Sequence, residues 1–263
     1  MRPGFDVLDR LAIEPPALFL DFDGTLAEIV ARPENVRVET ASLECVAALE
    51  LLLDGAVAIV TGREISDVDR FLSPQRFSVS GVHGFEFRRN GNEIERLEAY
   101  ALALSDVADQ LARFADDHDG LLVERKPASV AVHYRARPEL ADAASAAVRA
   151  GTARYPELKV LEGKMVIEVK AHGGTKASAV ARFMSSPPFE DRLPVFIGDD
   201  VTDEAAFGEV NDRGGISVKV GKGETLAHFR LDDPADVADW LQQLANRLQV
   251  LRNAPVGAQT GNV

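Results

Sequence analysis

Short apolar runs alternate with amphipathic helical patterns near both ends of the chain. Three of these runs, at residues 18–20, 56–60 and 195–197, are apolar at every position. Continuous apolar runs are typical of strands buried on both faces of a parallel sheet, and the patterns between them are typical of covering helices. The alternation therefore predicts an α/β fold with a doubly wound parallel sheet.

The middle of the chain has a different pattern. Asn90-Gly91 predicts a hairpin turn, and after it a helix followed by two strands occurs twice, with the helices at about 101–117 and 138–155. This order predicts an antiparallel α+β unit inserted into the parallel fold. We expect a discontinuous core at residues 1–99 and 172–252, an inserted cap at 100–171, and an aperiodic, flexible tail at 253–263.

Alternation along the cap strands separates an apolar face from a charged face. Val130 and Val132 alternate with Ala131 and His133, and we expect the valines to pack on the two cap helices. The opposite face would carry Glu124, Lys126, His133, Arg135, Lys164 and Glu168. This charged face can be a solvated sheet face, which is common in antiparallel sheets, or the lining of a lid that binds a polar ligand.

Charge and composition narrow the possible partners and location. The net charge of −13, from 42 acidic and 29 basic residues, argues against nucleic acid or an anionic membrane as a partner. No apolar stretch approaches the ~20 residues of a membrane span, and the first residues do not resemble an export signal. Cys45 is the only cysteine, which suits a cytoplasmic protein without an intrachain disulfide. The oligomeric state stays open, and a monomer is compatible with the sequence.

Two carboxylates follow the first apolar run directly. Asp21 and Asp23 stand in the segment Asp21-Phe22-Asp23-Gly24-Thr25. At the end of a buried strand, one carboxylate can attack phosphorus, while the other donates a proton to the leaving oxygen and later takes one from water. Gly24 permits a sharp turn that brings backbone N–H groups near a phosphate. An acidic pair alone is also common in ordinary turns.

A carboxylate that attacks a phosphate dianion needs cations nearby. Repulsion between two unit charges is roughly 4 kcal/mol at 4 Å and an effective dielectric near 20. Asp199, Asp200 and Asp203 follow the third apolar run and offer the hard oxygen ligands that suit Mg²⁺. Alone, they could also form a turn and a helix N-terminus capped by Thr202. Their expected position at the same sheet edge as Asp21 favours the metal site.

Two further segments offer donors for a phosphate group. Thr61-Gly62-Arg63 ends the second apolar run and begins a helix, where a hydroxyl and backbone N–H groups can hold an anion. Lys176 stands at the predicted start of another helix, a position that the helix dipole makes unfavourable for a cation. We therefore expect Lys176 to have a charged partner and to reach the phosphate.

Together these segments resemble the four motifs of the haloacid-dehalogenase superfamily of phosphotransferases. The motifs occur in order as Asp21 to Thr25, Thr61, Lys176 and Gly198 to Asp203. The resemblance implies a Rossmannoid core with an open-faced cap between the second and third motifs. It also implies phosphoryl transfer that depends on Mg²⁺.

Over about residues 14–250 the chain is similar to the trehalose-6-phosphate phosphatase family. The similar segments outside the four motifs are Gly81 to Gly84, Glu124 to Lys126, His133 to Arg135 and Gly163 to Glu168. The chain departs from the family pattern at Lys176-Ala177, where the family usually has Lys-Gly, and we expect little effect on the lysine.

This resemblance implies a role for each motif residue. Asp21 is the nucleophile, Asp23 is the general acid and base, and Thr61 and Lys176 hold the phosphate. The implied metal ligands are Asp21, Asp23 through its carbonyl, Asp199, and Asp203 directly or through water. The implied substrate-binding residues are Gly24, Thr25, Gly62, Arg63, His83, Glu124, Lys126, His133, Arg135, Lys164 and Glu168.

The implied reaction is hydrolysis of trehalose 6-phosphate, a small sugar phosphate, through an aspartyl-phosphate. A phosphatase for sucrose 6-phosphate or mannosyl-3-phosphoglycerate stays open, because the sugar assignment depends on the cap segments alone. A phosphomannomutase fits less well, and a receiver domain would lack both the inserted cap and Asp23. A non-catalytic binding module on the same fold is disfavoured because Asp21, Asp23, Lys176 and Asp199 are all present.

Overall fold

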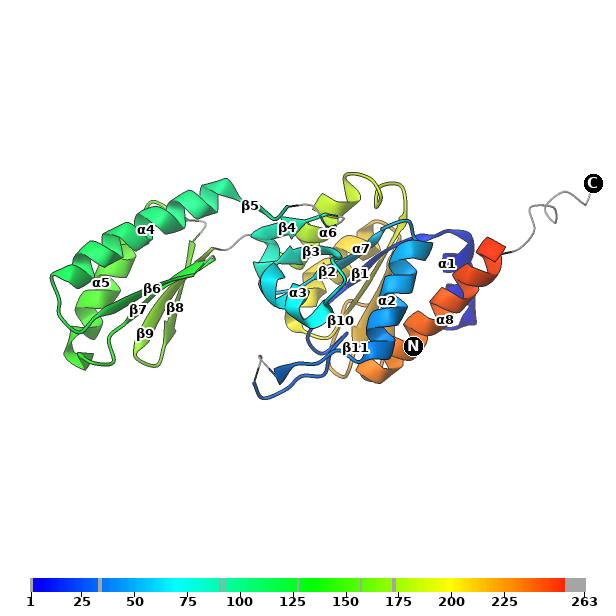
Figure 1. Ribbon diagram of the computed structural model, residues 1–263, viewed down its shortest axis with the longest axis horizontal. Helices are drawn as coiled ribbons and strands as arrows, with labels where there is room; N and C mark the ends of the chain where they lie inside the picture. Colours follow the sequence, from blue (N-terminus) through cyan, green and yellow to red (C-terminus); the bar gives the residue numbers. More distant parts are fainter. Residues whose placement is uncertain are drawn as a thin grey trace, which may run out of the picture. The chain divides into compact units, whose positions relative to one another are not determined.

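The computed structural model of the protein divides the chain into two compact units (Figure 1). The first combines Met1–Ile94 with Thr175–Val263, and the second is Glu95–Gly174, which we call the cap. The structure describes residues 2–32, 35–89, 91, 93–126, 128–156, 158–171 and 174–253. The predicted hairpin residue Asn90 and the predicted tail lie outside these ranges, except for Asn253, which ends a helix.

The larger sheet has eight strands, and all of them except β5 (Glu95–Arg96) belong to the first unit. Its strand order is β12-β11-β10-β1-β2-β3-β4-β5, in which the pairs from β12 to β3 are parallel and β4 runs antiparallel to β3. The strands are β1 (Pro16–Leu20), β2 (Val57–Val60), β3 (Ser78–Gly81), β4 (Glu86–Arg88), β5 (Glu95–Arg96), β10 (Leu193–Gly198), β11 (Ile216–Val220) and β12 (Phe229–Leu231). β1 and β2 are buried at every position, which confirms the parallel sheet predicted from their continuous apolar runs.

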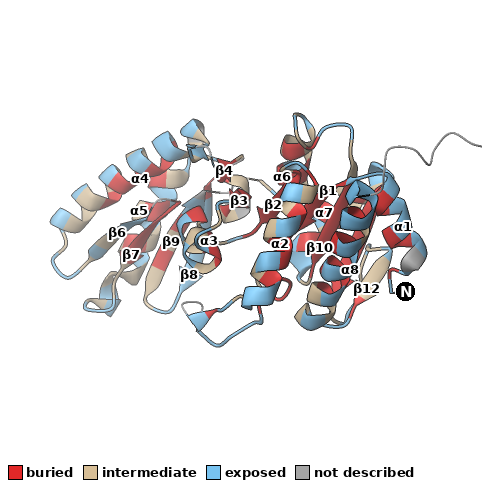
Figure 2. Cartoon of the chain, turned by 45° about the vertical axis from the view of Figure 1, so that its right-hand side comes forward, coloured by how far each residue is buried: buried red, intermediate tan, exposed pale blue. Residues whose placement is uncertain are grey.

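Two groups of helices pack against this sheet (Figures 1 and 2). One group consists of α1 (Phe5–Ile13), α2 (Thr40–Leu52) and α8 (Pro234–Asn253), in which α8 contacts both α1 and α2. In the other, α6 (Lys176–Met184) contacts α7 (Glu204–Asp212). The helix α3 (Ile65–Leu72) connects β2 to β3 and contacts β3. Cys45 of α2 is buried in the core, where desolvation raises the pKa of its thiol to about 11.

The position of β1 determines where a ligand site can form. β1 lies between β10 and β2, so the connections from neighbouring strands leave in opposite directions. In doubly wound sheets such a switch point opens a crevice at the carboxyl ends of the strands. The residues that follow β1, β2 and β10 all lie at this edge.

The cap contains a four-stranded antiparallel sheet of order β6-β7-β9-β8. Its strands are β6 (Leu122–Lys126), β7 (Ser129–His133), β8 (Leu158–Gly163) and β9 (Val166–Ala171). Two helices, α4 (Glu98–Asp116) and α5 (Ala141–Thr152), contact each other and this sheet. The repeated helix-strand-strand order predicted from the sequence is therefore confirmed.

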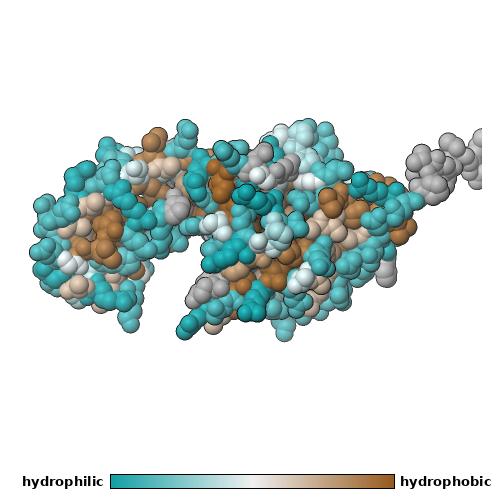
Figure 3. Space-filling view, viewed as in Figure 1, coloured by the Kyte–Doolittle hydropathy of each residue, from teal (hydrophilic) through white to brown (hydrophobic). Residues whose placement is uncertain are grey.

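On the face drawn in Figure 3, hydrophilic residues cover most of the surface of each unit. Among the residues that the structure describes, no helix has both the length and the apolar character required to cross a membrane.

β4 carries two buried charges that attach α3 to the sheet. The Glu86 carboxylate accepts a hydrogen bond of 2.8 Å from the backbone N–H of Ile65, the first residue of α3. The Arg88 guanidinium, which is 0% exposed, donates to both oxygens of Asp69 on α3 at 2.6 and 2.5 Å, and also to the carbonyl of Phe77. These contacts hold the helix that follows the Thr61 loop.

We expect Asp69→Ala to lower the free energy of unfolding by about 3–5 kcal/mol, because Arg88 loses the partner of its buried charge. The double variant Asp69→Ala/Arg88→Met should recover most of this loss. Asp67→Ala is the control on the same helix, since it removes an exposed pair with Arg70 and should cost less than about 1 kcal/mol. Chemical denaturation measures all three, and equal losses for the two single variants would contradict the interpretation.

Candidate active site

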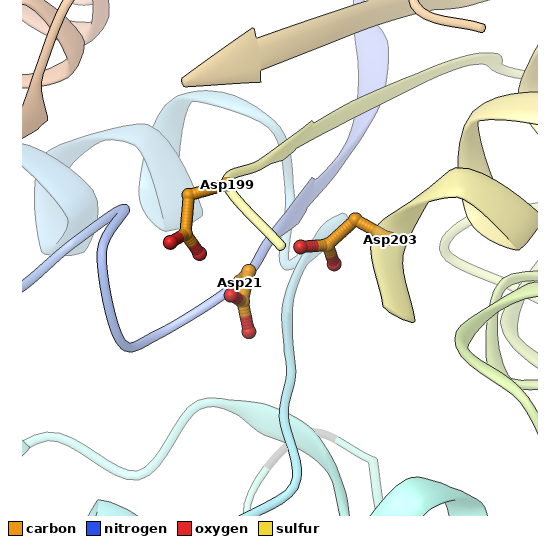
Figure 4. Close-up of side chains that lie close together, drawn as sticks. All are labelled: Asp21, Asp199 and Asp203. Atoms are coloured by element: carbon orange, nitrogen blue, oxygen red, sulfur yellow. The ribbon is translucent and has the colours of Figure 1, made fainter. Parts of the chain in front are cut away.

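Three carboxylates converge at the carboxyl edge of the core sheet (Figure 4). Asp21 directly follows β1, Asp199 directly follows β10, and Asp203 ends the short 3-10 helix Val201–Asp203 before α7. One oxygen from each carboxylate lies within 4.8 Å of the others. Asp21 and Asp203 are buried, and Asp199 is half-buried. The structure thus brings together three of the four predicted metal ligands.

Two nearby acids direct their carboxylates to other partners. The Asp23 carboxylate pairs with Arg63. The predicted metal contact of Asp23 is made by its main-chain carbonyl and stays a prediction. Asp200 is exposed and forms a capping box with Asp203 at the start of the 3-10 helix. Asp200, and not Thr202, is therefore the cap of this helix. The capping bond from the Asp200 N–H to Asp203 Oδ2, at 2.9 Å, orients Asp203 towards the cluster.

Lys176 joins two of the carboxylates. Its Nζ atom lies 2.7 Å from Asp21 Oδ1 and 2.6 Å from Asp203 Oδ1, and its side chain is only 4% exposed. The backbone places it there, because Lys176 is the first residue of α6, whose N-terminus is capped by Thr175. The charged partner predicted for this unfavourably placed lysine is present.

Burial and like charges shift the pKa values in this cluster. Burial raises the pKa of Asp21 well above its ordinary value, and the Lys176 ammonium offsets this effect only in part. Burial also raises the pKa of Asp199. Burial would lower the pKa of Lys176, but Asp21 and Asp203 outweigh it, and that pKa is raised. A cation bound beside these carboxylates would favour their ionised forms and lower the two raised carboxyl pKa values.

The donor atoms of the cluster fit a hard metal ion. Within the described part of the chain, Asp199 Oδ1 is buried without a hydrogen-bond partner. Gly24, with φ of 75°, leaves space beside this carboxylate, since a Cβ atom there would collide with Asp199 Oδ2. A Cβ atom at Gly198 would likewise collide with Asp203. Two glycines thus permit the close approach of the acidic loops, and carboxylate oxygens are suitable ligands for Mg²⁺.

The loop after β2 places a hydroxyl and a guanidinium near the cluster. Thr61 is buried, and its Oγ1 atom accepts a hydrogen bond of 3.2 Å from the N–H of Arg63. Arg63 donates to both oxygens of Asp23, from Nε at 2.6 Å and from Nη2 at 2.7 Å. The hydrogen bonds with Asp23 raise the pKa of Arg63. The sequence predicted Arg63 as a substrate ligand, whereas the structure pairs it with the predicted acid and base.

A cavity of about 400 Å³ opens above these residues in the core unit. Seven of the predicted site residues line it, namely Asp21, Asp23, Thr61, Gly62, Arg63, Lys176 and Asp199. The remaining lining residues are Ile29, Val30, Val36, Asp200 and Thr202.

Two other predicted substrate residues lie near this site. Thr25 is fully buried, and its Oγ1 atom has no hydrogen-bond partner among the described residues. His83 lies in the short 3-10 helix Val82–Gly84, but its side chain is outside the described part of the structure.

Four of the six residues predicted for the charged cap face lie on paired strands. Glu124 of β6 and Glu168 of β9 both pair across the sheet with Ala131 of β7, so their side chains share one face. The Glu124 carboxylate contacts His133 at 3.0 Å and Lys126 at 3.7 Å. Glu168 accepts a hydrogen bond of 2.7 Å from Ser129.

The other two cap residues lie beyond the strands. Arg135 follows β7, and Lys164 lies in the turn between β8 and β9, and both are exposed. A backbone hydrogen bond of 3.1 Å from Tyr134 to Met165 links the two segments. On the opposite face, Val130, Val132, Ile167 and Val169 are buried, as the alternation predicted.

Three residues at the core site were not anticipated from the sequence. Lys219 of β11 is buried, and its ammonium donates to the main-chain carbonyl of Asp199. A lysine inside an otherwise apolar strand is a signal that could have identified it. Ile29 and Val30 line the cavity although they are 72% and 38% exposed. Exposed apolar residues just after the Asp21 loop give only a weak signal.

Comparison with solved structures gives the class of the fold. The chain resembles a Bacteroides thetaiotaomicron phosphatase of the haloalkanoate (HAD) enzyme superfamily, with a TM-score of 0.54 and 16% identity. The match covers 89% of this chain and 94% of that chain, and it concerns the fold alone. The parallel core, the acids at its strand ends and the inserted cap give this chain the fold of the HAD-superfamily phosphatases. A family model described as trehalose-phosphatase matches residues 19–235, and the chain belongs to this family.

Individual relatives agree with this family. The chain is 38% identical over 236 residues to a trehalose-6-phosphate phosphatase of Escherichia coli (strain K12), covering 90% of this chain and 89% of the relative. It is 37% identical over 225 residues to a probable trehalose-phosphate phosphatase of Sinorhizobium fredii, covering 83% of each. A crystal structure of a trehalose-6-phosphate phosphatase related protein is similar, with a TM-score of 0.64 and 28% identity over 90% of this chain and 99% of that chain. A trehalose-6-phosphate phosphatase of Aspergillus fumigatus gives a TM-score of 0.63 and 26% identity over 91% and 96%.

Proposed function

We propose that this protein hydrolyses trehalose 6-phosphate to trehalose and phosphate. The observation that carries the proposal is the contact of Lys176 with both Asp21 and Asp203 beside Asp199, in a chain of the trehalose-phosphatase family. This arrangement supports transfer of a phosphoryl group to a carboxylate, because the ammonium can neutralise charge on the phosphate. Sucrose 6-phosphate and mannosyl-3-phosphoglycerate are the alternative substrates.

The proposed reaction has two steps. An oxygen of Asp21 attacks phosphorus, and the bond from phosphorus to the sugar oxygen breaks as Asp23 gives that oxygen a proton. Water then attacks the aspartyl-phosphate after Asp23 takes its proton, which releases phosphate and restores Asp21. Thr61 and Lys176 hold the phosphate oxygens in both steps, since both line the same cavity as Asp21.

The charge of the site supports a divalent cation as cofactor. Asp21 and Asp199 would bind Mg²⁺ together with the Asp23 carbonyl, and Asp203 would assist directly or through water. When bound, Mg²⁺ offsets the repulsion between the carboxylates and the phosphate dianion. Lys176 supplies a single positive charge, whereas the cluster contains three carboxylates.

The first test is the substrate. Phosphate release should be fastest from trehalose 6-phosphate in a panel with sucrose 6-phosphate, glucose 6-phosphate and mannosyl-3-phosphoglycerate. Asp21→Asn should abolish turnover because it removes the nucleophile, and beryllium fluoride should occupy Asp21 in the wild type. Near-wild-type turnover by Asp21→Asn would contradict the covalent mechanism. A clear preference for another ester would leave the mechanism intact but change the substrate.

Metal dependence can be measured with and without turnover. Dialysis against excess chelator should abolish phosphate release, and added Mg²⁺ should restore it. Mg²⁺ should also raise the Tm of the substrate-free protein, because a ligand that binds only the folded state stabilises it. Asp199→Asn should weaken this rise in Tm. Full turnover in chelator would refute the metal requirement.

The cap face should select the sugar. We expect Glu124→Ala, Lys126→Ala and Glu168→Ala each to reduce kcat/KM for trehalose 6-phosphate by about 10- to 150-fold, the equivalent of one charged hydrogen bond of ~1.5–3 kcal/mol. Each should spare p-nitrophenyl phosphate, which has no sugar to bind. Arg125→Ala is the control, because Arg125 lies between two of these residues on β6 but pairs with Asp109 of α4. Unchanged kinetics in all three cap variants would show that this face is merely solvated.

A further inference from the structure

Arg63 makes a two-point contact with the carboxylate of Asp23. Nε donates to Oδ2 and Nη2 donates to Oδ1, at 2.6 and 2.7 Å. A planar guanidinium bound in this way defines both the distance and the plane of the carboxylate, which a lysine ammonium cannot do. The Asp23 side chain is 39% exposed, so packing alone does not immobilise it.

Two aromatic rings hold the guanidinium itself. The Arg63 Cζ atom lies 5.5 Å from the ring centre of Phe22 and 5.1 Å from that of Phe71. The rings also stack on each other, with their centres 5.8 Å apart. Phe22 is fully buried and is the residue between Asp21 and Asp23, so one of the two rings belongs to the loop that carries the proposed nucleophile. Cation–π contact of this kind stabilises a fixed arginine orientation.

The backbone of Arg63 is fixed as well. Its N–H donates to Thr61 Oγ1 at 3.2 Å, and its carbonyl accepts from Val82 at 3.0 Å. Gly81 permits this approach, because a Cβ atom there would lie 2.8 Å from the Arg63 carbonyl oxygen. Arg63 is therefore positioned by its backbone and by its side chain before any substrate binds.

A general acid must lie within hydrogen-bond reach of the leaving oxygen, and small displacements cost large factors in rate. We propose that Arg63, packed beside the stacked rings of Phe22 and Phe71, is a positioning residue that holds the Asp23 side chain for proton transfer. Both hydrogen bonds form to the ionised base, and one of the two is given up while Asp23 carries the proton that it donates as acid. This inference rests on the proposed function, in which Asp23 is the acid and base. It replaces the role of Arg63 as a ligand of the substrate.

The two roles predict different kinetics. If Arg63 bound the substrate, its replacement would raise KM for every phosphate ester. If Arg63 positions Asp23, its replacement lowers the rate of phosphoryl transfer only from esters whose leaving group needs a proton, such as a sugar alkoxide. p-Nitrophenolate leaves without a proton, so transfer of its phosphoryl group to Asp21 is spared. The later hydrolysis of the aspartyl-phosphate needs Asp23 as base and is slowed for both esters.

The experiment compares Arg63→Gln, Arg63→Lys and wild type with Mg²⁺ present. Single-turnover rates with trehalose 6-phosphate should fall about 10- to 100-fold in both variants, within the range of general acid catalysis. With p-nitrophenyl phosphate, both should release one equivalent of p-nitrophenol per enzyme at near the wild-type rate, followed by slow turnover. Arg63→Lys keeps the charge and tests the two-point contact if Arg63→Gln does not fold.

Two further variants complete the test. Arg70→Gln is the matched control, because Arg70 lies over the same Phe71 ring at 4.7 Å but pairs with the exposed Asp67, and it should stay within about twofold of wild type. Phe71→Leu removes one of the two rings beside the Arg63 guanidinium. It should lower the single-turnover rate with trehalose 6-phosphate by about two- to fivefold, the equivalent of one cation–π contact.

The outcomes separate this inference from the proposed function. Wild-type single-turnover rates in Arg63→Lys, or an equal rise of KM for both esters with unchanged rates, would overturn the positioning role. Asp23→Asn in the same assay tests the function on which the inference rests. If Asp23→Asn is slowed while the Arg63 variants are not, only the positioning role fails. If Asp23→Asn is itself unaffected, the acid and base assignment fails.

Discussion

The concentration of negative charge at one edge of the core sheet is the constraint on which the site depends. Three carboxylates have oxygens within 4.8 Å of one another, and the buried Lys176 bridges two of them. Such a group is tolerable only where a cation compensates it and where the backbone lets the loops approach. Lys176 meets the first condition in part. Gly24 and Gly198 meet the second condition, because any side chain at either position would collide with an aspartate. The strand order brings the loops to one edge by placing β1 between β10 and β2.

An acidic protein that acts on an anion needs its own negative charge offset at the site. The net charge of −13 opposes a phosphate ester in general, and three basic side chains at the site offset part of the local negative charge. Lys176 contacts the nucleophile, Lys219 supports the main chain of Asp199, and Arg63 pairs with Asp23. The cap sheet buries valines on one face and presents paired charges on the other, and it is this charged face that we propose to bind the sugar.

Much of the fold could be predicted because its elements are signalled locally. Continuous apolar runs identified β1, β2 and β10, and strict alternation separated the two faces of β7. The positions of Asp21, Thr61 and Asp199 followed from this, since a residue after a parallel strand must lie at the carboxyl edge of the sheet. The suggestion that Thr202 caps the helix after the third apolar run was wrong. Asp200 is itself the cap, a distinction that depends on backbone angles which similar turn sequences share.

The sequence by itself determined the chemistry of the core, the order of its elements and the inserted cap. Each of these depends on residue types at short spacing or on which face a strand buries. Only the tertiary structure decided the partners of long side chains. Arg63 pairs with Asp23 where the loop after β1 meets α3, and its guanidinium packs beside the stacked rings of Phe22 and Phe71. Lys219 reaches the Asp199 carbonyl because β11 pairs with β10 in that register. Flexible side chains have many possible partners within reach, and packing between elements selects among them.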